Sequence, residues 1–134
     1  MGILGMILLD TQVLVWALEE SKFLSPAAAS EIRRGRRRGG LAVSAISMWE
    51  LAWLLSRGRI HAYGTMEASI RLLLEDVTVR PITPEIATLA AQFPADYPQD
   101  PADRLIGATA RAEGLTLVTR DERIRRSPLL KTVW

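Results

Sequence analysis

The sequence predicts an α/β protein, a three-layer α/β/α sandwich whose central sheet is mainly parallel. The first indication is a set of short, wholly apolar runs, such as residues 6–9 and 115–118, which is the pattern of strands buried on both faces. The second is that these runs alternate with longer segments of helical spacing. Alternating strands and helices favour a parallel sheet with helices on both faces.

The predicted elements follow one another without a repeat or a low-complexity tract. Strands are expected at residues 6–9, 41–43, 77–79, 115–118 and 132–133. Helices are expected at residues 11–20, 26–38, 45–56, 66–75, 84–92, 101–113 and 122–126. Ser25 and Ser44 stand where N-caps are favoured, and Pro26 occupies a first helical position. Gly39-Gly40 and Gly114 are expected to end helices.

Length and composition restrict the kind of protein and of metal site. At 134 residues the chain is expected to form one domain, residues 1–134. The absence of cysteine excludes disulfides and thiolate sites, and the single histidine, His61, excludes a histidine-rich zinc site. Any bound metal is therefore expected to have oxygen ligands, as Mg²⁺ or Mn²⁺ does.

The N-terminal residues do not have the pattern of a targeting segment. The apolar run at residues 3–9 lacks a basic leader, and Asp10 interrupts it far short of a membrane-spanning length. We interpret residues 1–5 as an N-terminal extension, with Met1 and Met6 both open as the native start. The expectation is a cytoplasmic protein without a membrane segment.

Positive charge is unevenly distributed, although the formal net charge is only +2. One block of arginines comprises Arg33, Arg34, Arg36, Arg37 and Arg38, and a second comprises Arg120, Arg123, Arg125 and Arg126. Such blocks suit a phosphate backbone. The alternative is a solvated helix face without a binding role.

Single carboxylates interrupt or follow the apolar runs. Asp10 and Asp121 each come directly after a predicted strand and before a helix, where capping would also explain an aspartate. Asp103 has a similar alternative, because Asp100 can be the N-cap and Asp103 the acidic residue of a capping box.

Glu50 does not fit the capping explanation. It lies in the middle of a predicted helix that is apolar on nearly all sides, and a carboxylate there is costly unless it is paired or binds a metal. The alternative is a salt bridge with Arg57 or another arginine. In a parallel sheet, ligands bind beyond the carboxyl ends of the strands. If Glu50 faces that crevice, four carboxylates share one pocket, and a divalent cation would neutralise their repulsion.

These segments together resemble PIN-domain ribonucleases, and most of all the VapC toxins of bacterial toxin–antitoxin pairs. The matching segments are Leu9-Asp10-Thr11, the helical Glu50, Asp100-Pro-Ala-Asp103-Arg-Leu-Ile-Gly-Ala-Thr-Ala and Leu-Val-Thr119-Arg-Asp121. The resemblance spans essentially the whole chain, and the Asp-Pro-x-Asp-Arg-Leu-Ile stretch is its most specific part. Ala102 departs from the pattern, because many relatives have a bulky residue there.

The resemblance implies a Mg²⁺- or Mn²⁺-dependent endoribonuclease. Asp10, Glu50, Asp103 and Asp121 would be the catalytic, metal-binding carboxylates. Asp100 would be an auxiliary residue, and the hydroxyls of Thr11 and Thr119 would orient a carboxylate or a water. Arg104 and Arg120 adjoin these residues and are expected to hold a substrate phosphate, with ordinary surface ion pairing as the alternative.

Aromatic residues suggest a protein partner. Trp49 and Trp53 share one face of a predicted helix, and Trp16 and Phe23 add to the aromatic content, although such residues more often belong to a core. We interpret part of the Trp49–Trp53 face as a homodimer or antitoxin surface. The resemblance implies the same partners: a second copy and a cognate antitoxin laid across the groove.

Two other classes of protein compete with the nuclease interpretation. A phosphorylated receiver domain also has acidic residues at strand ends, but here no pair of aspartates follows the first strand and Lys131 is too near the terminus. The second alternative is a non-catalytic partner-binding module whose acidic residues are helix caps. Metal binding distinguishes that module from a nuclease.

Overall fold

The computed structural model describes residues 5–134 and has the predicted α/β architecture. Residues 1–4 of the predicted extension lie outside the described part. Within residues 5–134 the strands are β1 (Ile7–Leu9), β2 (Leu41–Ser44), β3 (Val77–Arg80), β4 (Thr116–Val118) and β5 (Thr132–Val133). The helices of this part are α1 (Thr11–Glu19), α2 (Pro26–Arg37), α3 (Ile46–Ser56), α4 (Met66–Leu73), α5 (Pro84–Gln92), α6 (Pro101–Glu113) and α7 (Glu122–Arg125), with a 3₁₀ turn, η1 (Ser21–Phe23), that was not predicted.

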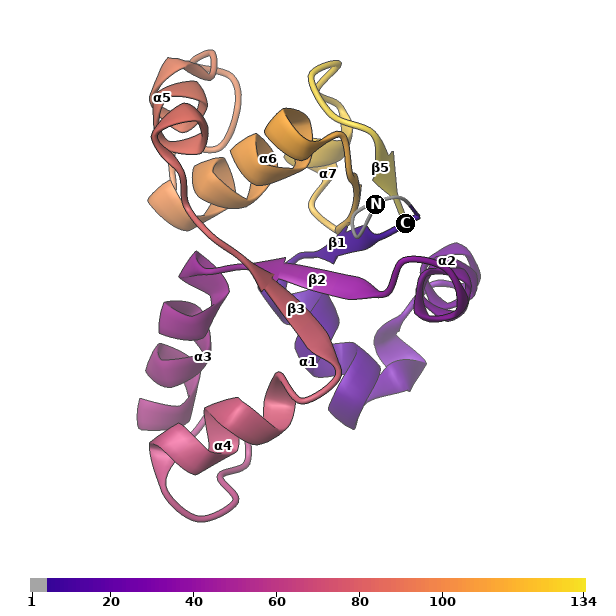
Figure 1. Ribbon diagram of the computed structural model, residues 1–134, viewed down its shortest axis with the longest axis vertical. Helices are drawn as coiled ribbons and strands as arrows, with labels where there is room; N and C mark the ends of the chain where they lie inside the picture. Colours follow the sequence, from indigo (N-terminus) through magenta and orange to yellow (C-terminus); the bar gives the residue numbers. More distant parts are fainter. Residues whose placement is uncertain (1–4) are drawn as a thin grey trace.

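The five described strands form one sheet in the order β3-β2-β1-β4-β5, and every neighbouring pair is parallel. Helices α1 to α4 lie on one side of this sheet and α5 to α7 on the other (Figure 1). Side chains of β1 alternate between the two sides: Leu8 packs in the α5–α7 layer, whereas Ile7 and Leu9 pack in the α1–α4 layer. The predicted three-layer sandwich is confirmed.

The helix boundaries agree closely with the capping residues and glycines predicted to start and end the helices. Ser25 accepts a hydrogen bond from the backbone N–H of Ala28, with Pro26 at the first helical position. Gly114 ends α6 with φ of 66°, the left-handed conformation that glycine adopts without strain. Ser44 differs slightly from expectation: Ala45 is the N-cap of α3, and the Ser44 hydroxyl accepts from the N–H of Ile46 at 3.2 Å.

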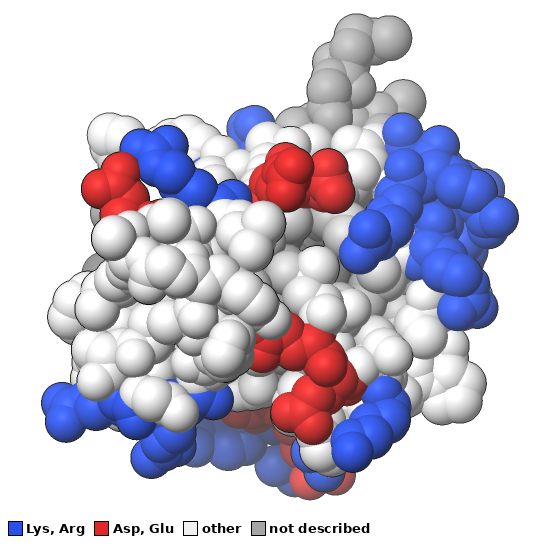
Figure 2. Space-filling model, turned by 90° about the horizontal axis from the view of Figure 1, so that it is seen from below, with Lys and Arg blue, Asp and Glu red and all other residues white. Residues whose placement is uncertain are grey.

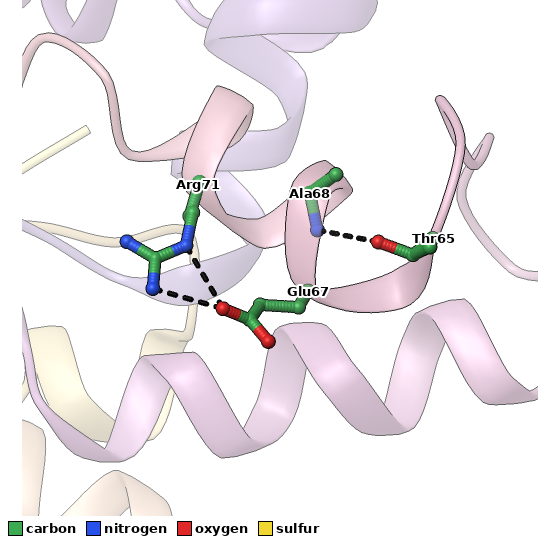
Figure 3. A network of polar contacts seen from close by, with 4 residues as sticks. All are labelled: Thr65, Glu67, Ala68 and Arg71. Carbon is green, nitrogen blue, oxygen red and sulfur yellow. Dashed lines mark hydrogen bonds and ion pairs between the residues drawn. The ribbon is translucent and has the colours of Figure 1, made fainter.

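Helix α4 shows how local side-chain contacts define a short helix at the surface. Thr65 accepts a hydrogen bond from the N–H of Ala68 at its N-terminus, and Arg71 donates to the Glu67 carboxylate at 2.9 Å one turn along (Figure 3). Both side chains of this ion pair are mostly exposed, so its contribution to stability is small. The helix packs on α3, and its Leu73 is buried in the hydrophobic cluster of the α1–α4 layer.

Gly107 allows α6 to pack tightly against the segment that precedes it. A Cβ atom at this position would overlap the Tyr97 hydroxyl and approach the Phe93 ring to 3.1 Å. Tyr97 is 1% exposed, and its hydroxyl donates to the backbone carbonyl of Asp103 at 3.2 Å. This contact fixes the first turn of α6 relative to residues 93–98.

We expect Gly107→Ala to lower the free energy of unfolding by about 1–3 kcal/mol, because overpacking outweighs the better helix propensity of alanine. Tyr97→Phe removes the hydroxyl that the new methyl group meets. The double variant should therefore lose less stability than the sum of the two single variants, as measured by chemical denaturation. Strict additivity would contradict this account.

Candidate active site

The carboxyl ends of β1 and β4 meet where the strand order reverses. From this point β1, β2 and β3 follow one another toward one edge of the parallel sheet, and β4 and β5 follow one another toward the other edge. Asp10 directly follows β1, and its N–H donates to the carbonyl of Val118 at the end of β4, at 3.1 Å. Ligands of open parallel sheets bind in the crevice at such a point.

A cavity of about 660 Å³ lies at this crevice, within the size range of ligand-binding sites. Its walls come from the start of α1, from α3 and from the first turn of α6. The cavity brings together five residues predicted from the sequence: Asp10, Thr11, Glu50, Asp100 and Asp103. Asp121, Thr119, Arg104 and Arg120 are not among its lining residues.

Asp10 occupies an N-cap position but does not cap α1 with its side chain. Its carboxylate instead accepts a hydrogen bond from the hydroxyl of Thr119 at 2.8 Å, across the two neighbouring strand ends. Burial raises the pKa of Asp10, and the hydrogen bond from Thr119 opposes that shift. Side-chain capping therefore does not explain Asp10, and its hydrogen bond with Thr119 is compatible with the orienting role expected for that hydroxyl.

Glu50 is held by a chain of two hydroxyl groups. Thr11 donates to the Glu50 carboxylate, and because its only proton is used there, the buried Ser47 hydroxyl must donate to Thr11 at 2.7 Å. Burial is also the main cause of the raised pKa of Glu50. The alternative salt bridge with Arg57 does not form among the described residues.

Ser47 was missed by the sequence reasoning. The available signal was its position three residues before Glu50, which places both side chains on one face of the same helix. A serine on an otherwise apolar helix face, one turn from a carboxylate, is a candidate hydrogen-bond partner for the site.

Asp103 is the least compensated carboxylate of the group. It is half-buried, and its carboxylate has no hydrogen-bond partner within residues 5–134. Burial raises its pKa to about 7, and the negative charges of Asp10, Asp100, Glu50 and Asp121 add to the shift. The capping-box alternative is therefore not realised at this residue.

Asp100 and Asp121 do act as helix caps. Asp100 accepts from the N–H of Ala102 at 3.3 Å, and one oxygen of Asp121 accepts from the N–H groups of Arg123 and Ile124 at 2.8 and 3.2 Å. Capping does not remove Asp121 from the electrostatics of the site, since its charge raises the pKa of both Asp10 and Asp103.

The prediction that Arg104 binds a substrate phosphate is not supported. Its guanidinium group donates to four backbone carbonyls, those of Ala90, Phe93, Pro94 and Pro98, at 2.9–3.0 Å. These bonds use most of its five donors, so Arg104 ties the segment at residues 93–98 to α6. Arg120 is exposed, and its guanidinium lies 5.7 Å from the ring centroid of Trp16.

The chemistry of the cavity fits a divalent cation with oxygen ligands. The pKa values of Asp10, Glu50 and Asp103 are all raised, and a bound cation would relieve that cost. Within residues 5–134, however, no three acidic or histidine side chains come close enough to share one ion in this conformation. Mg²⁺ does not require three, because it commonly keeps several waters and binds one or two carboxylates.

Comparison with known proteins agrees with this arrangement. A profile of the PIN domain matches residues 7–128, which is most of the chain. The chain belongs to the PIN-domain family. It is 43% identical over 130 residues to Ribonuclease VapC22 of Mycobacterium tuberculosis, an alignment that covers 96% of this chain and 98% of that protein.

Solved structures share the PIN-domain fold at low sequence identity. The chain is similar to one in VapBC2 from Rickettsia felis bound to a promoter DNA fragment, with a TM-score of 0.73, 18% identity and coverage of 95% and 96% of the two chains. It is also similar to one in DNA-bound VapBC from Salmonella typhimurium, with a TM-score of 0.70, 20% identity and coverage of 94% and 95%. These likenesses confirm the fold.

Family membership supports a divalent metal in general terms, because PIN-domain ribonucleases generally use one. The choice between Mg²⁺ and Mn²⁺ stays a prediction. No helix in the described part of this PIN domain is long and apolar enough to cross a membrane.

The raised pKa of Asp103 makes the stability of the metal-free protein depend on pH. Because its folded pKa of about 7 lies above the ordinary value of 3.8, the folded state holds a proton that the unfolded state has lost, and stability falls as pH rises from about 4 to 7. Asp103→Asn should therefore raise the free energy of unfolding above pH 7 by about 1–2 kcal/mol, less than the full shift implies because water screens a half-buried site.

The measurement is thermal unfolding in EDTA between pH 5 and pH 8. The matched control is Asp96→Asn at an exposed position outside the cavity, which should leave the pH dependence unchanged. An Asp103→Asn variant that is less stable than the wild type at pH 8 would contradict the electrostatic account.

Proposed function

We propose that this chain is a single PIN domain and a metal-dependent endoribonuclease, the toxin of a toxin–antitoxin pair. The observation that carries the proposal is the group of carboxylates with raised pKa values at the point where the strand order reverses. The 43% identity to a protein named Ribonuclease VapC22 supports hydrolysis of RNA phosphodiester bonds as the reaction.

In this proposal Asp10, Glu50, Asp103 and Asp121 hold Mg²⁺ or Mn²⁺, with Asp100 as an auxiliary residue. When bound, such an ion supplies Lewis-acid activation of water and neutralises charge that develops on the phosphate. The hydroxyl of Thr119 fixes the orientation of the Asp10 carboxylate. Thr11 and Ser47 do the same for Glu50, so that these two carboxylates need not reorder during the reaction.

Binding of the RNA backbone would use exposed arginines outside the cavity rather than Arg104. Arg120 adjoins Asp121 and is exposed to solvent. A larger basic area lies over helix α2, at the right of Figure 2 and apart from the acidic side chains on that face. Such areas attract a polyanion over long range and position it without reading its sequence.

Two protein partners belong to the proposal, a second copy of the chain and a cognate antitoxin, with both acting in the cytoplasm. Helices α3 and α4 expose apolar side chains for such contacts, and a second, mostly apolar cavity between them is lined by Met48, Met66, Ile70 and Leu74 together with Glu67 and Arg71. We expect sedimentation of the purified chain to give twice its 14.9 kDa mass. A monomer that also fails to bind the protein encoded beside it would contradict this part of the proposal.

The decisive test combines cleavage with metal binding. We expect Asp10→Asn and Asp103→Asn to reduce RNA cleavage by at least about a hundredfold, beyond the 10- to 100-fold effect usual for residues that only support a metal ligand. Mn²⁺ should raise the unfolding midpoint of the wild type, since it binds only the folded state, and should not raise that of Asp103→Asn.

Asp96→Asn is the control and should behave as the wild type in both assays. Full cleavage by Asp10→Asn would overturn the catalytic assignment. If Mn²⁺ shifts neither protein and no RNA is cleaved, the chain is better described as a non-catalytic partner-binding module whose acidic residues are structural.

A further inference from the structure

Two exposed tryptophans form part of the wall of the acidic cavity. We propose that Trp49 and Trp53 are a stacking platform for an unpaired nucleobase of the RNA, next to the phosphate that a cation held by the carboxylates would bind. The inference rests on the proposed ribonuclease function and adds a base-binding subsite to it. The ligand class is therefore single-stranded RNA with at least one unstacked base.

The position of the two indoles relative to Glu50 is the first support. Trp49, Glu50 and Trp53 all line the same cavity, and they lie on consecutive turns of α3. Residues three and four apart are neighbours on a helix surface. A phosphate bound to a cation at Glu50 and Asp103 would therefore share one cavity with the two indoles.

The exposure of these side chains is the second support. Trp49 is 62% exposed and Trp53 is 40% exposed, although tryptophan is highly buried on average. Within residues 5–134 neither indole pairs with another aromatic ring. Trp16 contrasts with them, since it packs against Phe23 and Trp134 at centroid distances of 5.8 and 5.9 Å. No aromatic ring of the described residues therefore stacks on the cavity tryptophans, and a nucleobase could take that place.

A cation beside the indoles provides the third support. The guanidinium of Arg57 lies 5.0 Å from the ring centroid of Trp53, and Arg57 forms no salt bridge among the described residues. Aromatic rings with a neighbouring arginine are the combination by which proteins bind single-stranded nucleic acid: bases stack on the rings and the cation meets the phosphates. A cation held at the acidic floor of the cavity and this wall would bind successive parts of one strand.

A protein partner is the competing occupant of this surface. The apolar cavity that contains Met48 opens elsewhere between α3 and α4 and shares no lining residue with the acidic cavity. An apolar protein surface seated on Trp49 and Trp53 would also bury Glu50, Asp100 and Asp103, which have no basic partner among the described residues. With a cation held by the carboxylates, a nucleotide phosphate would meet positive charge in the cavity and an apolar protein surface would leave that charge without a partner, which favours the nucleotide.

The test is equilibrium binding of a fluorescein-labelled, mixed-sequence single-stranded RNA 12-mer, measured by anisotropy in an Asp10→Asn background to prevent cleavage. Trp49→Leu and Trp53→Leu keep an apolar side chain but remove the π face. Each should weaken binding about fivefold or more, the lower end of the stacking contribution of one base. Trp49→Phe and Trp53→Phe should restore most of the affinity.

Two controls separate stacking from a general effect on structure. Phe23→Leu alters an aromatic side chain of similar exposure (45%) outside the cavity and should leave binding unchanged. The second control is a series of 12-mers with one abasic site each. At one position, removal of the base should weaken binding by the Asp10→Asn protein that keeps both tryptophans. The same removal should not weaken binding by the protein that also carries Trp49→Leu. Such coupling is the signature of a direct base–indole contact.

Unchanged affinity in both leucine variants, or the absence of coupling at every abasic position, would overturn the platform. It would also be overturned if the leucine variants lose affinity only because they no longer sediment as the wild type does, since the face would then belong to a protein contact. The proposed nuclease function is tested separately, by RNA cleavage. If the wild type cleaves no RNA but the base–indole coupling is observed, the nuclease function is refuted and the stacking platform is still supported.

Discussion

The concentration of carboxylates without a basic partner around the carboxyl ends of β1 and β4 is the constraint on which the site depends. Burial raises the pKa of Asp10, Glu50 and Asp103, so in the absence of a cation the folded state bears the cost of their charge at neutral pH. Within residues 5–134 no arginine or lysine pairs with them. Burial of the two hydrophobic layers on either side of the sheet must offset this cost, and a bound cation would stabilise the folded state and so reduce it.

The stretch that begins at Asp100 positions a single carboxylate by several independent contacts. Asp100 caps the helix, Arg104 binds the carbonyls of the preceding segment, and Gly107 leaves room for Tyr97. Tyr97 then donates to the carbonyl of Asp103 itself. Asp100, Arg104 and Gly107 thus each have a structural reason to be there. Together they hold Asp103 toward the cavity on a turn of helix that cannot easily shift, which is the condition for a preorganised site.

Much of the fold followed from patterns that are local in the sequence. Buried strands were recognisable from the apolar runs around Leu8 and Leu117, and a helix end from the glycine at 114. The parallel sheet and most element boundaries were therefore predicted within a few residues. Glu50 was also identifiable, because a carboxylate in an apolar helix requires a special reason. The structural role of Arg104 was not predicted, for the opposite reason. Its partners are carbonyls up to 14 residues away, and only the folded path of residues 90–98 brings them to its guanidinium.

Helix α3 links the two halves of the proposed substrate site. Glu50 faces the carboxylate group and Trp49 and Trp53 form the adjoining wall, so one rigid element fixes the distance between a bound phosphate and its neighbouring base. Exposed indoles favour unwanted association, and a surface that keeps two of them beside an acidic pocket therefore has a functional reason to do so. Any segment that covers this cavity must bury the indoles and the acids together. Occupation of the wall alone would displace a stacked base, so inhibition of the nuclease would not require direct contact with the carboxylates.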